Sequence, residues 1–238
     1  MKRSTINSAI RQAIDLCKEM KFLLPPFAFW SLDDWPAKVD AAKEILDNQM
    51  GWDITDFGTG DYESTGLLIF VLRNGNFTDS RYKKPYCEKI LIQNENQVLP
   101  MHYHWKKMED IINRGGGNLM VALHNAISDS EPDQKTPVVV TMDGEQHTFA
   151  PGEAVRVKPG ESITLEPHQF HRFWAESGTG PVLLGEVSTV ADERTDNNFP
   201  EYDLRLPDVE EDERPLHLLF RDYEIVRDRE LWPEIWRD

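Results

Sequence analysis

Apolar and polar residues in the first fifty positions follow the period of a helix. A stripe spaced by three and four residues predicts a first helix, which Ser4 is placed to cap and which Pro25 ends. The stripe consists of Ile6, Ile10, Ala13, Ile14 and Cys17. A second helix is expected to begin near Ser31-x-x-Asp34, a capping-box pattern with Pro36 in the first turn.

The pattern changes after Gly51 to short apolar runs separated by turns. The run 67–72 is a strand closed by Asn74-Gly75, and turn pairs such as Asp143-Gly144 and Pro159-Gly160 punctuate the later chain. The remaining strands are expected at 88–92, 101–105, 109–114, 118–124, 137–142, 146–149, 154–157, 162–166, 170–175 and 181–189. Many short strands with frequent turns predict a mainly β fold, a sandwich or a barrel.

Three further segments lack this pattern of short apolar runs separated by turns. Residues 128–135 are polar and are expected to form a surface loop, and the acidic, proline-containing stretch 192–214 a long covering loop. The tail 221–238 mixes charges with apolar residues, which indicates an amphipathic strap on the body or on a second subunit. We therefore expect an N-terminal helical arm (1–50), a barrel (51–220) and a C-terminal extension (221–238).

Charge and cysteine content restrict the partners and the compartment. Lys plus Arg number 26 and Asp plus Glu 42, so the 238-residue chain carries a formal charge of −16. This surplus argues against nucleic acid and anionic membrane as partners. Cys17 and Cys87 form no Cys-x-x-Cys pattern, which indicates a reduced, cytoplasmic protein.

The strongest chemical signal is His102-Tyr103-His104 followed by Glu109. Residues i and i+2 of a strand share a face, so both imidazoles would lie side by side, and a divalent metal would satisfy them. Glu109 can join them only if the chain turns between Trp105 and Met108. By itself, the histidine pair fits a half-exposed strand face equally well.

The surroundings of the histidine pair resemble the two motifs of the cupins. The first motif is Gly, five residues, His-x-His, three or four residues, Glu, six residues and Gly; here it ends at Gly116, and Asn96 replaces the first Gly. Asn tolerates the left-handed conformation of a turn glycine. In the second motif Gly160 precedes His171 by eleven residues, and His168 stands where Gly is usual.

The cupin resemblance implies a double-stranded β-helix, or jelly-roll barrel, with His102, His104, Glu109 and His171 as metal ligands. His168 would then line the pocket. Three His and one Glu suit Mn²⁺, Fe²⁺, Co²⁺, Ni²⁺ or Zn²⁺, and spacing does not choose among them. Two open positions on the ion could hold two substrate oxygens, or one ligand and dioxygen.

Longer runs resemble one group of cupins, the D-lyxose ketol-isomerase family, from about residue 6 to 220. The runs are LPPFA at 24–28, MGWDITDFG at 50–58, HYHWKKMEDIINRGGGN at 102–118, GEVSTV at 185–190 and DNNF at 196–199. The resemblance implies a manganese-dependent aldose–ketose isomerase acting on D-lyxose and D-xylulose, and on D-mannose and D-fructose.

The same resemblance assigns the remaining site residues. Lys107 is the expected active-site lysine, and Glu201, with Glu186 as competitor, the expected acid/base carboxylate. The expected substrate-binding residues are Trp105, His168, Phe173 and Asp192. The segment Ala191-Asp192-Glu193 departs from the family pattern of Asn followed by two Asp.

Isomerisation moves a hydrogen between C1 and C2, which requires a Lewis acid at O1 and O2 and a proton carrier. A single metal beside ionisable groups favours a cis-enediol over a hydride shift. The alternatives are an Fe²⁺ cupin dioxygenase and a sugar-binding cupin without catalysis. The resemblance also leads us to expect a homodimer.

Overall fold

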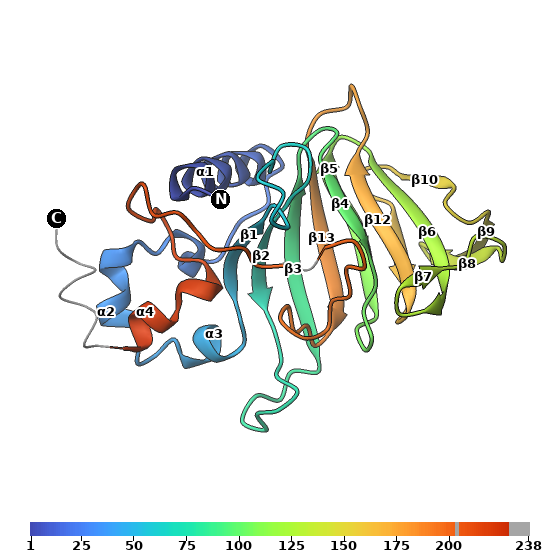
Figure 1. Ribbon diagram of the computed structural model, residues 1–238. Helices are drawn as coiled ribbons and strands as arrows, with labels where there is room; N and C mark the ends of the chain where they lie inside the picture. The colour runs from blue at the N-terminus through green and yellow to red at the C-terminus, as the bar shows by residue number, and fades with distance from the viewer. Residues whose placement is uncertain (203–204, 229–238) are drawn as a thin grey trace.

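Two antiparallel sheets curl around a shared apolar interior in the computed structural model, which describes residues 1–202 and 205–228 (Figure 1). Within these ranges the larger sheet has the order β1-β2-β3-β13-β5-β11-β8-β9, and the smaller has the order β10-β6-β12-β4 with β7 beside β6. The strands are β1 Gly51–Thr55, β2 Leu67–Arg73, β3 Tyr86–Gln93, β4 Val98–His102, β5 Glu109–Gly116, β6 Leu119–Ser128, β7 Glu131–Pro132, β8 Val138–Met142, β9 Glu145–Phe149, β10 Ala154–Val157, β11 Ser162–Leu165, β12 Gln169–Ala175 and β13 Val182–Thr189. The prediction of a mainly β, cupin-type barrel is confirmed.

Strand boundaries differ from the predicted ones at three places. The strand expected at 101–105 ends at His102, so only the first histidine of the pair lies in it. The stretch 128–135, expected to be a loop, contains the short strand β7 paired with β6. The strand β1, which the sequence pattern did not predict, pairs with β2 along its whole length.

The helices precede and follow the barrel. They are α1 Arg3–Glu19, α2 Trp35–Lys38, α3 Lys43–Asp47 and α4 Glu224–Arg227, with 3₁₀ turns η1 Pro26–Phe29, η2 Leu32–Asp34 and η3 Phe220–Asp222. The predicted second helix is thus divided into a 3₁₀ turn and two short helices, although Ser31 and Asp34 do form the predicted capping box. Among the described residues, no helix is both long and apolar enough to span a bilayer.

The predicted cap at Ser4 is wrong. The helix α1 begins one residue earlier, at Arg3, with Lys2 at the capping position. Ser4 instead donates hydrogen bonds from its backbone N–H and its hydroxyl to the two carboxylate oxygens of Asp212, at 2.9 and 2.7 Å. The carboxylate of Asp212, far away in the sequence, therefore takes the place of the local cap that the Ser4 side chain was expected to form.

The helix α1 packs on the outer face of the larger sheet. Leu68 and Phe70 of β2 join Ile10 of α1 in one apolar cluster, whereas Leu67 and Ile69 face the barrel interior. This alternation is the two-residue period of a strand that is covered on both faces.

Residues after the last barrel strand attach the N-terminus. The buried guanidinium of Arg3 forms ion pairs with Glu211 at 2.6 Å and with Asp222 at 3.0 Å. The predicted tail 221–238 is described as far as Asp228, and its apolar residues Leu231 to Trp236 lie outside the described residues. The division into arm, barrel and extension stays a prediction.

Candidate metal centre and active site

Three histidines converge in the interior between the two sheets. His102 ends β4 and lies opposite His171 of the neighbouring strand β12, and His104 follows two residues after His102. All three are buried, and one ring nitrogen from each lies within 4.8 Å of the others. The sequence motif therefore forms a cluster and not an exposed strand face.

Each of these imidazoles is oriented by a backbone carbonyl. The Nδ1 atom lies 2.8 Å from Pro100 O in His102, from Asp196 O in His104 and from Gln169 O in His171. Because a carbonyl can only accept, Nδ1 carries the proton and Nε2 presents its lone pair to the cluster. A second hydrogen bond of this kind is characteristic of metal-ligating histidines.

Glu109 reaches the cluster from the opposite sheet. Its Oε1 lies 3.2 Å from His104 Nε2 and 3.3 Å from His171 Nε2. The chain bends at Trp105 and Lys106, as predicted, and this bend brings β5 and Glu109 beside the histidines.

The protonation states of these groups suit a cation. Burial lowers the pKa of His102 well below the ordinary histidine value and also lowers that of His171. Burial by itself would raise the pKa of Glu109, but the Lys107 ammonium and His104 hold it well below the ordinary value. The imidazoles of His102 and His171 and the carboxylate of Glu109 thus face one another with lone pairs. The buried His171 Nε2 has no hydrogen-bond partner among the described residues, and a divalent cation fits this donor set.

Lys107 lies beside the cluster, and its neighbour Lys106 is exposed. The Nζ of Lys107 lies 2.6 Å from Glu109 Oε2 and 2.9 Å from Glu186 Oε1. Burial opposes the charge on Lys107, yet Glu109 and Glu186 raise its pKa above the ordinary lysine value. The lysine is therefore held as an ammonium that bridges two carboxylates.

Three charged residues of the same cavity were missed by the sequence analysis. Lys89 lies 3.1 Å from Glu186 Oε1 and also binds Glu193, whose other oxygen is 3.1 Å from Arg205 Nη2. Burial opposes charge on Lys89 and Glu193, but their mutual attraction keeps the pKa of Lys89 well above and that of Glu193 well below the ordinary values. Lys89 could have been identified as a site residue from the sequence, because a lysine at an inward-facing position of the apolar strand β3 is unusual.

The two predicted acid/base carboxylates lie in different places. Glu186 points into the cavity from β13, where it contacts both Lys107 and Lys89. Glu201 is exposed, and it is outside the set of described residues that line the cavity. The geometry thus favours Glu186 over Glu201.

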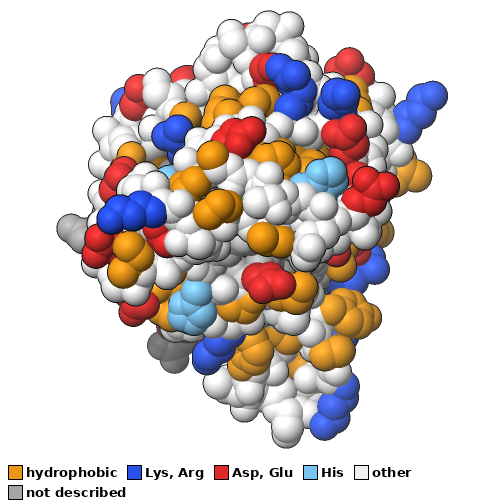
Figure 2. Space-filling model, turned by 90° about the vertical axis from the view of Figure 1, so that its right-hand side faces the viewer, with side chains coloured by type: hydrophobic (Ala, Val, Ile, Leu, Met, Phe, Trp, Pro, Cys, Tyr) orange, Lys and Arg blue, Asp and Glu red, His pale blue; other side chains and the backbone are white. Residues whose placement is uncertain are grey.

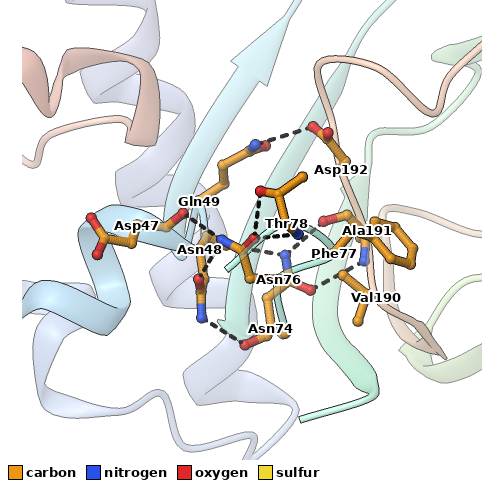
Figure 3. Close-up of a pocket in the computed structure, with 11 residues that line it drawn as sticks. Asp47, Asn48, Gln49, Asn74, Asn76, Phe77, Thr78, Val190, Ala191 and Asp192 are labelled. Carbon is orange, nitrogen blue, oxygen red and sulfur yellow. Dashed lines mark hydrogen bonds between the residues drawn. The ribbon is translucent and has the colours of Figure 1, made fainter. Parts of the chain in front are cut away.

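Asp192 faces a separate polar cavity of about 170 Å³. Figure 3 shows its carboxylate reaching Gln49, whose Nε2 donates to Asp192 Oδ1 at 3.1 Å. In the same view Asn74 donates to Ala191 O, at 2.7 Å, and its Oδ1 accepts from Ala191 N, at 3.1 Å. These contacts hold the chain that leads to Glu193 but turn Asp192 away from the histidines.

The other predicted substrate-binding residues are placed at different depths. Phe173 is buried in the cavity wall and stacks on His171, with ring centroids 5.2 Å apart. Trp105 is 36% exposed and packs edge-on against Tyr103. His168 is also exposed and adopts a left-handed conformation with φ 61°, as expected where Gly is usual.

Asn96 replaces the first glycine of the first cupin motif, and its φ of 62° shows that the left-handed turn predicted there is present.

The fold and the cluster together define a cupin whose barrel carries a candidate metal site. The family model for D-lyxose isomerase matches residues 1–223, and the chain belongs to this family.

Curated relatives agree with this membership over nearly the whole chain. The D-lyxose/D-mannose isomerase of Serratia proteamaculans is 46% identical over 225 residues, which cover 94% of this chain and 98% of the relative. The D-lyxose/D-mannose isomerase of Escherichia coli O157:H7 is 43% identical over 228 residues, covering 95% and 100%.

Solved structures support the fold at low identity. The L-ribose isomerase of Cellulomonas parahominis with L-ribose has a TM-score of 0.58 at 16% identity, covering 88% of this chain and 98% of that one. The L-ribose isomerase of Acinetobacter sp. DL28 with L-ribose has a TM-score of 0.54 at 16% identity, covering 84% and 92%. The barrel with its N-terminal helices is thus shared with other sugar isomerases.

Proposed function

We propose that this protein is a metal-dependent aldose–ketose isomerase that interconverts D-lyxose with D-xylulose and D-mannose with D-fructose. The observation that carries the proposal is that the buried metal donors contact a buried pair of acid/base groups. The ligand Glu109 touches Lys107, which touches Glu186, so metal donors and an acid/base pair share one cavity. The names of the family relatives support the choice of sugars.

His102, His104, His171 and Glu109 would hold the cation, and we propose Mn²⁺ as the native ion. When bound, a divalent cation supplies Lewis-acid polarisation of the sugar oxygens. The protein contributes fixed ligand orientations through the three Nδ1 hydrogen bonds.

Lys107 and Glu186 are suited to divide the proton transfers. The ammonium of Lys107 can donate to a sugar oxygen that gains negative charge as the C2 proton leaves. Oε1 of Glu186 lies 3.1 Å from Lys89 Nζ and 2.9 Å from Lys107 Nζ, which fixes this carboxylate in the cavity, where it can accept the carbon-bound proton. Such a division leads through a cis-enediol, in which the proton from C2 is returned to C1 while a proton moves between O2 and O1.

Metal removal and return tests this function directly. Purified protein treated with a chelator should lose conversion of D-lyxose to D-xylulose, and added Mn²⁺ should restore it, because three imidazole nitrogens and the Glu109 carboxylate converge on one point in the barrel. Conversion is followed by chromatography of the two sugars. Conversion that is insensitive to the chelator, or absent with every pentose and hexose tried, would refute the proposal.

Two other properties stay predictions. A homodimer is expected, and exposed apolar side chains such as Ile127 of β6 and Val139 of β8 are available on the surface. Figure 2 shows the end of the molecule at the right of Figure 1, where apolar side chains alternate with acidic and basic ones. The cytoplasmic location agrees with two free, buried thiols, Cys17 and Cys87.

A further inference from the structure

Asp196 touches the metal site twice, although it is not a ligand and no motif assigned it a role. Its backbone carbonyl accepts the Nδ1 hydrogen bond of His104 at 2.8 Å. Its carboxylate accepts the backbone N–H of Lys106 on Oδ1 and that of Lys107 on Oδ2, both at 3.0 Å. The side chain is 4% exposed. One residue therefore fixes both a histidine ligand and the bend that carries the catalytic lysine.

The backbone N–H groups of Lys106 and Lys107 lie in the bend that joins β4 of the smaller sheet to β5 of the larger sheet, outside both strands. The acceptor of each is the carboxylate of Asp196. A carboxylate satisfies both, because each oxygen takes one donor, and charge-assisted hydrogen bonds are roughly twice as strong as neutral ones.

Asp196 belongs to a segment that covers the site, which we define as residues 191–199. The segment is anchored at its start by Asn74 on Ala191 (Figure 3). At its other end Asn198 exchanges two backbone hydrogen bonds with Tyr103, at 2.9 and 3.1 Å. Phe199 stacks on His102 with ring centroids 4.6 Å apart.

The covering segment forms part of the wall of a small cavity. The space beside the histidines is about 20 Å³. Such a volume holds about one water molecule, far less than a sugar. Asn197 and Phe199 belong to the wall, so movement of this segment would enlarge the space beside the histidines.

We propose that Asp196 is a positioning residue that couples cation binding to the seating of the covering segment. This inference rests on the proposed metal function. His104, when it ligates a cation, would hold the carbonyl of Asp196 through its Nδ1 hydrogen bond. The carboxylate of Asp196 then keeps Lys107 aimed at Glu109 and Glu186. Displacement of the segment for sugar access releases the same contacts.

The variant Asp196→Asn tests the inference, because an amide keeps the shape but can accept from only one of the two N–H groups through its single oxygen. We expect the dissociation constant for Mn²⁺ to rise about 10–100-fold, the usual cost of disturbing an outer partner of a metal ligand, because without both carboxylate contacts residue 196 no longer holds its carbonyl firmly on His104. The measurement is the electron paramagnetic resonance signal of free Mn²⁺ during titration.

The chain offers a matched control in Asp133. Its carboxylate also accepts two backbone N–H groups, from Lys135 and Thr136, and its carbonyl also lies at hydrogen-bond distance, 3.0 Å, from a histidine Nδ1, that of His124. This histidine is outside the cluster. Asp133→Asn should therefore bind Mn²⁺ as the wild type does.

A second measurement needs no variant. Addition of Mn²⁺ to metal-free wild type should slow amide hydrogen exchange at Tyr103, Lys106 and Lys107 and leave Lys135 and Thr136 unchanged. If Asp196→Asn binds Mn²⁺ as tightly as Asp133→Asn, or if Mn²⁺ leaves exchange at these three amides unaltered, the inference is overturned while the proposed function stands. A wild type that binds no Mn²⁺ would overturn both.

Discussion

Replacement of Lys107 by methionine is expected to lower kcat about 10²–10⁴-fold, the usual worth of one acid/base group. Methionine fills a similar space but removes the ammonium that lies 2.6 Å from Glu109 and 2.9 Å from Glu186. The metal content should stay full, because the three histidines and Glu109 remain. Steady-state kinetics together with metal analysis of the purified variant measure both quantities.

Lys106→Met is the matched control for this variant. Lys106 is the adjacent lysine, its side chain is exposed over Phe77, and only its backbone N–H contacts the site. Turnover of this control should equal that of the wild type. Normal turnover by Lys107→Met would remove this lysine from the mechanism.

Replacement of Glu109 by glutamine should have a comparably large effect, but through the cation. The carboxylate is the only anionic member of the donor set, and its Oε1 lies within 3.3 Å of two histidine Nε2 atoms. We expect affinity for Mn²⁺ to fall by more than the ~10–100-fold typical of an outer partner, and activity to fall with it. Calorimetric titration of the metal-free protein gives the affinity.

Glu88→Gln is the control for loss of one carboxylate. Glu88 pairs with Arg73 at 3.1 Å on the face of β3 that points away from the cluster, and its side chain is 28% exposed. Its Mn²⁺ affinity should match the wild type. A Glu109→Gln protein with full affinity for Mn²⁺ would show that the carboxylate is not a ligand.

The approach of His102, His104 and Glu109 to one another was predictable from the sequence because these residues obey local rules. His102 and His104 are two residues apart, and the spacing to Glu109 required a bend that the structure contains. The left-handed turn at Asn96 was likewise predicted from a position that glycine usually occupies. Long runs of family-like sequence then pointed to the reaction.

The rest of the site depends on contacts between distant parts of the chain. Lys89 on β3 and Glu186 on β13 meet only because the two strands pair in the larger sheet. Glu193 enters from the covering segment, and neither its burial nor its partner could be read from the local sequence. Glu201, eight residues later, matched the expected region but lies exposed.

The same distinction holds for the fold. Short apolar runs predicted the strands β2 and β3, and the runs are apolar because both faces of each strand are buried, against different clusters. At Ser4 the local capping rule failed, because Asp212 supplies the hydrogen-bonding partner from more than two hundred residues away. Local sequence rules therefore locate helices and strands, whereas contacts with distant residues determine where these elements begin and end.

Turnover in heavy water tests the central claim most directly, namely that buried ionisable groups beside the cation transfer a proton. The isomerase is incubated with D-lyxose in D₂O, and the D-xylulose formed is examined by NMR and mass spectrometry. A cis-enediol route predicts deuterium at C1 of the product, because the proton taken from C2 exchanges with solvent before it is returned. Complete retention of the original C2 hydrogen over many turnovers would contradict the proposed mechanism.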